Sequence, residues 1–180
     1  MNSFPVKTYY LEMLEPVAGE PPDPGPNVEM EHLPRPALDF YRGLYDAVGR
    51  DWYWVDRLVM PDADLRAILQ DPRVEVHLLK SGGGPAGYAE LDRRIEGQIE
   101  LAYFGLLPEF IGRGLGKYLL AWAVRKAWSY RPSRVWVHTC DLDHPGALPL
   151  YQRGGFRLYD ERFVDQAVHP GRPLPSRPHA

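Results

Sequence analysis

The sequence predicts an α/β (α+β) domain with a single mixed, mostly antiparallel sheet flanked by helices. Three short β-type segments follow one another in mid-chain and are joined by glycine-containing turns, which favours a meander of strands. A long segment without proline, Arg113–Trp128, then repeats its apolar residues at helical spacing. Strand-like, helix-like and strand-like segments follow it. This alternation is typical of one sheet with helices packed on its faces.

The composition is that of one ordinary globular domain. The chain has 180 residues, of which 44% are hydrophobic and 25% charged, and this length leaves little room for a second domain. The 24 acidic and 21 basic side chains give a formal net charge of −3. Because there is no net basic field to attract a phosphate backbone, we expect no nucleic-acid partner.

The sequence also predicts a cytoplasmic protein without a membrane partner. Cys140 is the only cysteine, so it cannot form an intrachain disulfide. Pro5 and nearby glutamates interrupt the region where a signal peptide would need an apolar core. No apolar run is long enough to span a membrane as a helix.

The N-terminal part is predicted to contain one strand and two helices. Lys7–Leu14 is rich in tyrosine and apolar residues, which favours a strand, and the proline-rich stretch 21–26 follows it. Apolar residues recur at helical spacing over Arg35–Val48, just before a glycine. A shorter helix is predicted over Pro61–Leu69, because Asp71–Pro72 stops it.

The rest of the chain is predicted to form the sheet and its covering helices. The predicted strands are Val74–Leu79, Gly87–Asp92, Gln98–Leu106, Arg134–Thr139 and Phe156–Val164, and the predicted helices are Arg113–Trp128 and Ala147–Arg153. The expected domain is 1–168. Residues 169–180 are rich in proline and are expected to be a disordered tail.

The strongest signal for chemistry is the segment GRGLGK, Gly112–Lys117, between a predicted strand and the start of the long helix. Glycines let backbone N–H groups approach an anion closely, and a helix N-terminus offers unpaired donors and partial positive charge. Arg113 and Lys117 add full positive charge. These features favour a pyrophosphate cradle; the alternative is a glycine-rich turn selected only for backbone geometry.

Two common nucleotide-binding motifs do not fit this segment. A P-loop would need Ser or Thr after Lys117, where Tyr118 stands. The glycine offsets differ from the Rossmann fingerprint, and the preceding strands form a meander instead of opening a βαβ unit. A dinucleotide or ATP is therefore disfavoured.

Two segments resemble motifs of the GCN5-related N-acetyltransferase (GNAT) superfamily. Leu106–Leu120, LLPEFIGRGLGKYLL, resembles the acetyl-CoA loop and the helix after it. Ala147–Phe156, ALPLYQRGGF, resembles the segment in which a small helix bearing a tyrosine ends in glycine and phenylalanine. The resemblance covers the motif-bearing core 74–163, and it implies a GNAT-like acyl-CoA N-acyltransferase fold.

The resemblance implies acetyl-CoA as the acetyl donor. It assigns the thioester carbonyl to a backbone amide near Leu106, with Phe104 and Leu107 nearby. The implied pyrophosphate-binding loop consists of Ile111, Gly112, Arg113, Gly114, Leu115, Gly116 and Lys117. Ile111 departs from the family pattern, which has Gln or Arg there. His144 stands where the family often has Asn, so it either hydrogen-bonds the pantetheine arm or simply lies in its loop.

The same resemblance implies the catalytic groups. Tyr151 matches the tyrosine that often protonates the departing thiolate, a role that a nearby phenol can fill. An aliphatic amine is mostly protonated at neutral pH, so a base is also expected. Glu100 is the predicted base, and Glu90 or Asp92 on the preceding strand are alternatives to it. His138 is interpreted as a packed strand residue.

No metal is expected. The donors His138, Cys140, Asp141, Asp143 and His144 lack the spacing of a zinc framework. A lone cysteine such as Cys140 is more often a small buried hydrophobe than a nucleophile. The aromatic run Asp51–Val55 falls where the variable region of the family covers the acceptor, although packing of core and lid is the favoured explanation.

The predicted function is N-acetyl transfer from acetyl-CoA directly to a primary amine of a small-molecule or peptide acceptor. The alternative is a non-catalytic acyl-CoA-binding sensor or structural module with the same fold. Tyr151 favours the enzyme, whereas Ile111 favours the alternative. A homodimer is also open, since dimers are common in families of this kind.

Overall fold

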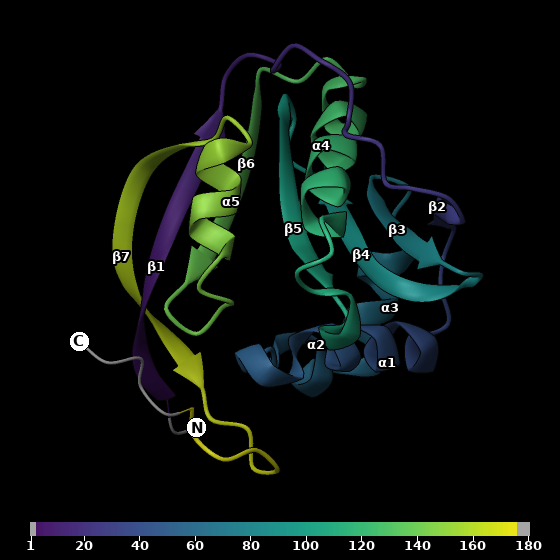
Figure 1. Ribbon diagram of the computed structural model, residues 1–180. Coiled ribbons are helices and arrows are strands. Elements are labelled where there is room, and N and C mark those ends of the chain that lie inside the picture. Colours follow the sequence, from purple (N-terminus) through teal and green to yellow (C-terminus); the bar gives the residue numbers. More distant parts are fainter. Residues whose placement is uncertain (1–2, 176–180) are drawn as a thin grey trace.

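A seven-stranded sheet in the order β2-β3-β4-β5-β6-β1-β7 organises the protein in the computed structural model, which describes residues 3–175 (Figure 1). The strands are β1 (Ser3–Met13), β2 (Val28–Leu33), β3 (Val74–Ser81), β4 (Gly84–Asp92), β5 (Gln98–Leu106), β6 (Arg134–Cys140) and β7 (Arg157–Ala167). The helices are α1 (Leu38–Gly49), α2 (Asp56–Val59), α3 (Asp62–Gln70), α4 (Leu115–Trp128) and α5 (Ala147–Arg153), with 3₁₀ turns at Arg50–Trp52 and Pro108–Phe110. The predicted mixed, mostly antiparallel sheet is confirmed.

The sheet opens between its two parallel strands. β5 and β6 are paired from Gln98↔Arg134 to Glu100↔Trp136, and the pairing ends there. The strands then diverge, as Figure 1 shows between α4 and α5. All other neighbouring strands pair in antiparallel fashion. The sheet is thus two antiparallel halves joined at one short parallel contact.

Helices cover both faces because the strand residues alternate between them. Leu79 packs in the cluster beneath α4, together with Leu119 and Ala123 of that helix. Its neighbour Leu78 packs in a second cluster, against Tyr41 of α1 and Leu65 of α3. The long helix and the N-terminal helices therefore lie on opposite faces of the same strands.

Two elements are not predicted by the sequence pattern. β2 is a short edge strand that pairs with β3, and α2 has four residues, too few to show a helical period. The N-terminal strand is predicted, but its place is not: β1 lies between β6 and β7 and pairs with both. The partners of β1 lie more than 100 residues away in the sequence, so its place depends on how the whole sheet assembles.

The segment after β7 packs against the domain as far as it is described. The backbone N–H of His169 donates to the hydroxyl of Tyr53 (3.0 Å), and Arg172 donates to the carbonyl of Trp54 (2.9 Å). The end of the predicted disordered tail, residues 176–180, lies outside the described residues.

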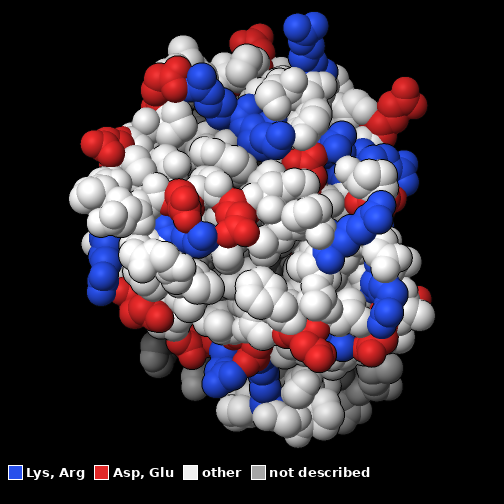
Figure 2. Space-filling view, turned by 90° about the vertical axis from the view of Figure 1, so that its right-hand side faces the viewer, with Lys and Arg blue, Asp and Glu red and all other residues white. Residues whose placement is uncertain are grey.

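The surface carries no single dominant charge on the face shown in Figure 2, where basic and acidic side chains are interspersed. Among residues 3–175, no helix is both long enough and apolar enough to cross a membrane.

Candidate functional site

The divergence of β5 and β6 opens a cleft of about 490 Å³. Its walls come from β5, the glycine-rich loop before α4, β6, the loop that leads into α5, and the segment from α1 to α2. Motifs that are distant in sequence therefore meet around one space. A cleft of this size is typical of a small-molecule site.

One wall of the cleft is an unpaired strand edge. Leu107 donates its N–H to the carbonyl of Ala86 (2.9 Å) and so faces β4. Because alternate residues of an antiparallel strand turn their amides to opposite sides, Phe104 and Leu106 turn theirs toward β6. β6 has already diverged there, since its pairing with β5 ends at Glu100. These backbone groups face the cleft without a neighbouring strand.

The glycine-rich loop forms the start of α4. Gly112 and Gly114 both have a φ of +82°, a conformation that glycine adopts without strain. A Cβ atom at either position would meet no atom within 4 Å, so backbone conformation and not crowding requires glycine. Gly114 is the N-cap residue of α4, and Lys117 and Arg153 also line the cleft. Amides and cations together suit an anionic group.

Tyr151 reaches the cleft from α5. Its side chain is buried, and its ring centroid lies 5.8 Å from that of Phe104 on β5. Burial, and then the charge of Asp143, raise the pKa of the Tyr151 phenol above its ordinary value. The hydroxyl is therefore protonated at physiological pH and has a proton to donate.

Glu100 and His138 form a pair where the two strands separate. The Nδ1 atom of His138 lies 3.2 Å from Oε1 of Glu100. Burial disfavours a charged imidazole, but the hydrogen bond and charge of Glu100 outweigh it and raise the pKa of His138. His138 lines the cleft, whereas Glu100 lies behind it. The imidazole thus stands between the predicted base and the cleft.

The alternative carboxylates are engaged elsewhere. Glu90 is fully buried and accepts hydrogen bonds from Tyr41 (2.5 Å) and Arg57 (2.8 Å). Asp92 is paired with Arg94 at 2.6 Å. Neither lines the cleft, so both serve the packing of the strands.

His144 and Cys140 also line the cleft. His144 accepts a hydrogen bond at Nδ1 from the backbone N–H of Gly146 (2.9 Å), and its ring packs against Trp52. Burial and then the charge of Asp143 raise the pKa of the Cys140 thiol to about 12. A neutral thiol is a poor nucleophile, which agrees with its interpretation as a packing residue.

The cleft brings together most of the predicted site residues: Phe104, Leu106, Ile111, Gly112, Gly114, Gly116, Lys117, His144 and Tyr151. Four others lie outside its lining. Glu100 is paired with His138, and the amide of Leu107 is hydrogen-bonded to the carbonyl of Ala86. Leu115 is the first residue of α4 and is buried in the core. The guanidinium of Arg113 lies over the ring of Phe110.

The sequence interpretation missed one side of the cleft. Tyr45, Tyr103 and Trp54 form a cluster of rings that lines this side, and Asp56 and Gln166 lie beside it. The aromatic run at Asp51–Val55 was the only local signal. The remaining residues come from α1, α2, β5 and β7, so no contiguous motif contains them.

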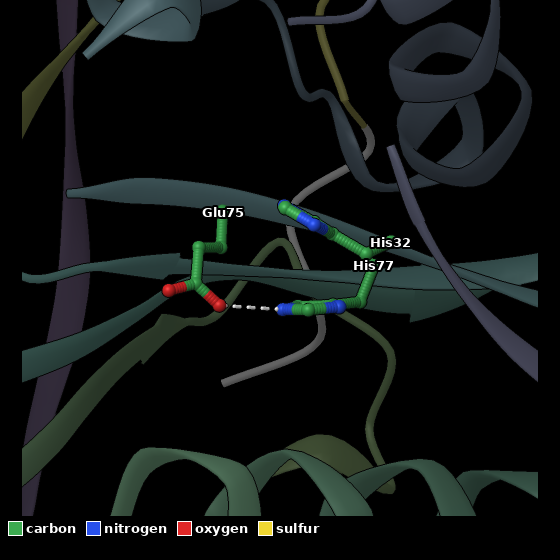
Figure 3. A group of neighbouring side chains, drawn as sticks. All are labelled: His32, Glu75 and His77. Atoms are coloured by element: carbon green, nitrogen blue, oxygen red, sulfur yellow. Dashed lines mark hydrogen bonds and ion pairs between the residues drawn. The ribbon is translucent and has the colours of Figure 1, made fainter. Parts of the chain in front are cut away.

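A second cluster of polar side chains lies away from the cleft, at β2 and β3 (Figure 3). His32 stacks on His77, and His77 is hydrogen-bonded to Glu75 at 2.9 Å. Their donor atoms lie within 4.8 Å of one another, as a metal site would require.

The surroundings of Glu75 favour an ion-pair network over a metal centre. Tyr130 donates to its carboxylate (2.6 Å), Arg93 is paired with it (2.9 Å), and the Nζ atom of Lys126 lies 3.8 Å away. Two cations already balance the carboxylate, so a divalent ion would meet uncompensated positive charge.

The fold and the cleft define a class of protein, the acetyltransferases with a sheet that opens beside a glycine-rich helix start. The family model described as "Acetyltransferase (GNAT) family" matches residues 41–156. The chain therefore belongs to the GNAT acetyltransferase family, whose members use acyl-CoA. No curated protein sequence matches the chain.

Solved structures agree in fold. A GCN5-related N-acetyltransferase from Sphaerobacter thermophilus is 20% identical, with a TM-score of 0.61 over 97% of this chain and 56% of its own. An IAA acetyltransferase from Bacillus cereus ATCC 14579 is 25% identical, with a TM-score of 0.58 over 74% of this chain and 79% of its own.

A GNAT family acetyltransferase from Elizabethkingia anophelis, solved with acetyl-CoA bound, is 20% identical, with a TM-score of 0.57 over 76% of this chain and 80% of its own. Some similar structures are longer than this chain. The chain spans 61% of a functionally unknown conserved protein from Staphylococcus epidermidis ATCC 12228 and 56% of the Sphaerobacter protein.

Proposed function

We propose that the protein transfers the acetyl group of acetyl-CoA directly to a primary amine of a small-molecule or peptide acceptor. One observation carries this proposal: the unpaired edge of β5, the glycine-rich start of α4 and the Tyr151 hydroxyl all border the same cleft. These are the groups that a thioester carbonyl, a pyrophosphate and a departing thiolate would each need.

The residues present fit acetyl-CoA as the donor. The loop Ile111–Lys117 would hold the pyrophosphate, because amides at the start of α4 and the charge of Lys117 face the cleft. The backbone N–H of Leu106 would donate to the thioester oxygen and stabilise the negative charge that develops there. His144 borders the space for the pantetheine arm.

Two proton transfers complete the proposed reaction. The acceptor nitrogen forms a bond to the acetyl carbon as the carbon–sulfur bond breaks. Tyr151, which its raised pKa keeps protonated, gives its proton to the departing sulfur. The proton from the amine goes to a base that borders the cleft, and proximity in the cleft supplies much of the rate.

The geometry supports Glu100 acting through His138 as that base. If Glu100 holds the proton on Nδ1 of His138, the other ring nitrogen carries a lone pair that can accept a proton. His138 is then the group that touches the acceptor, and Glu100 is a positioning residue. Glu100, predicted from the sequence as the base itself, is proposed here to act only through His138.

The first experiment is a calorimetric titration of the purified protein with acetyl-CoA, with ATP and NAD as controls. Micromolar binding of acetyl-CoA alone, followed by amine-dependent release of the CoA thiol, is the expected result. Binding without thiol release for any amine would favour the non-catalytic acyl-CoA-binding module. Absence of binding would overturn the proposal. Sedimentation of the same sample tests the homodimer that the sequence leaves open.

A further inference from the structure

Two carboxylates line the cleft, and they differ in their partners. Asp143 accepts hydrogen bonds from Trp54 (2.9 Å), from the hydroxyl of Thr139 (2.7 Å) and from the backbone N–H of Cys140 (3.0 Å). Both of its oxygens are therefore used to hold the loop before α5 against β6. This carboxylate has a structural role.

Asp56, in contrast, has one carboxylate oxygen without a hydrogen-bond partner among the described residues. Gln166 donates to its Oδ1 at 3.2 Å, and among the described residues no cation is paired with it. Its side chain is exposed and borders the cleft. An unpaired carboxylate on the wall of a cleft can form a charge-assisted hydrogen bond with a cationic group of a bound ligand.

Aromatic rings flank this carboxylate. Ring centroids of Tyr45, Trp54 and Tyr103 lie 5.0 to 5.4 Å apart, and all three side chains border the cleft. The face of an aromatic ring attracts cations. One cation of the protein itself lies by these rings: the guanidinium of Arg57 is 5.1 Å from the centroid of the Tyr103 ring. The buried carboxylate of Glu90 is paired with Arg57 and balances its charge.

The C-terminal segment narrows this side of the cleft. Gln166 contacts Asp56, His169 contacts Tyr53, and Arg172 bonds to Trp54 and is paired with Asp46. Figure 1 shows this yellow segment at the same end of the molecule as α1 and α2. The cleft of about 490 Å³ must hold the pantetheine arm as well as the acceptor. Little room is left for a folded protein surface.

We propose that the acceptor is a small amine with a second cationic group, which Asp56 holds beside the rings of Tyr45, Trp54 and Tyr103. This inference rests on the proposed function and names its acceptor class. The second cation stays at Asp56, while the reacting amine lies toward His138 and gives up its proton there. The aromatic cluster and Asp56 are then the specificity-determining residues.

Three amines of equal chain length test the charge requirement. They are 1,4-diaminobutane, n-butylamine and 4-aminobutanoate, whose far ends are cationic, apolar and anionic. With saturating acetyl-CoA, we expect kcat/KM to fall in that order, with about tenfold or more between the diamine and the monoamine. Equal use of the three amines, or preference for the anionic one, would overturn the proposal.

The variant Asp56→Asn keeps the shape of the side chain and removes its charge. We expect it to lower kcat/KM for 1,4-diaminobutane about tenfold to a hundredfold, chiefly through KM, and to lower it much less for n-butylamine, which has no second cation. Asp64→Asn is the matched control, since Asp64 is an exposed carboxylate at the start of α3 and does not border the cleft. A preference for the diamine that survives in Asp56→Asn would contradict the assignment.

Binding measurements separate this inference from the proposed function. Titration of 1,4-diaminobutane into protein loaded with CoA requires no turnover, and we expect it to bind more weakly in Asp56→Asn than in the native protein. If acetyl-CoA binds and is used but the diamine is not preferred, only the inference fails. If acetyl-CoA does not bind, the proposed function fails, and the diamine titration of the free protein still decides whether Asp56 holds a cation.

Discussion

The two sides of the cleft are built in different ways. On the side proposed to hold acetyl-CoA, here called the donor side, the glycine-rich loop and the start of α4 come from one continuous stretch, Gly112–Lys117, and present mainly backbone amides. On the proposed acceptor side, Tyr45, Trp54, Asp56 and Gln166 come from three separate segments and present side chains.

This difference agrees with what each side is proposed to bind. A pyrophosphate is recognised by amides and charge at a helix start, and local sequence is enough to build that. An acceptor is recognised by side chains with particular shapes and charges, which can come from any element that reaches the cleft. On the donor side, substitutions that change only a side chain should therefore have little effect on binding, whereas those that change the backbone conformation should abolish it. On the acceptor side, substitution of a single side chain should be enough to change binding.

The largest expected effect is the loss of acetyl-CoA binding in Gly114→Glu. A side chain at a φ of +82° strains the backbone, and the carboxylate would place negative charge at the proposed pyrophosphate site. Calorimetry should detect no binding at acetyl-CoA concentrations that saturate the native protein.

Gly83→Glu is the matched control for that change. Gly83, in the β3–β4 turn, has a φ of +86°, and a Cβ there would also meet nothing within 4 Å. The same backbone strain is thus introduced far from the cleft. If both variants lose acetyl-CoA binding, general destabilisation would explain the result and the loop assignment would be wrong.

A smaller loss is expected for Tyr151→Phe. Only the hydroxyl is removed, so acetyl-CoA affinity should stay within about twofold while kcat falls roughly 100-fold. Steady-state kinetics and calorimetry measure the two quantities separately. Tyr118→Phe on α4, outside the cleft lining, is expected to leave both unchanged. A native kcat in Tyr151→Phe would remove the proposed acid role.

The change Glu100→Gln should alter the pH dependence of the reaction. A base must be deprotonated to act, so kcat/KM rises with pH through the pKa of His138, which Glu100 raises. Without that charge, the pKa of His138 falls and the acid limb of the profile moves to lower pH. The rate maximum should also drop, by about tenfold, because the imidazole is held less well.

The imidazole signals of His138 in an NMR titration provide the independent measurement. Their midpoint should move to lower pH in Glu100→Gln together with the kinetic limb. An unchanged profile, with a shifted His138 midpoint, would show that another group accepts the amine proton.

The smallest effect on the reaction is expected for Glu75→Gln, in the cluster of Figure 3. Burial opposes ionisation of Glu75, but hydrogen bonds from His77 and Tyr130 and the charge of Lys126 outweigh it and lower its pKa to about 2. Its stabilisation is therefore present above pH 4.5 and is lost as the pH falls toward 2.

Chemical denaturation checks this prediction. At pH 7 the variant should lose about 2 kcal/mol of unfolding free energy, because the half-buried cations of Arg93 and Lys126 lose the carboxylate that balances their charge. The difference between the variant and the native protein should shrink as the pH falls toward 2. Glu31→Gln, an exposed neighbour on β2, should cost little. Acetyl-CoA binding should be native in both variants, and its loss would connect this cluster to the cleft.

Much of the fold could be predicted because it is specified locally. The bounds of β5 and α5 are as predicted, since turn residues and periodic apolar residues mark both ends of each element. β2 and α2 were missed because one is a short edge strand and the other is a single turn. Neither carries enough residues to show a period.

The candidate site was predictable only in part, for the same reason. Gly112 and Gly114 were identified because their conformation is a property of the loop itself. The contact between Glu100 and His138 joins β5 and β6, which pair with each other although α4 separates them in the sequence. Likewise, Gln166 meets Asp56 only because β7 extends along β1 to the far end of the sheet.

The sequence by itself determined the order of the elements other than β2 and α2, the glycine-rich helix start and the tyrosine of α5. Each of these depends on φ, ψ and side-chain spacing over a few residues. Only the tertiary structure decided that β1 lies between β6 and β7, that β5 and β6 diverge after Glu100, and that an unpaired Asp56 borders the resulting cleft. Those features depend on contacts between residues far apart in the chain, and the packing of the whole sheet selects them.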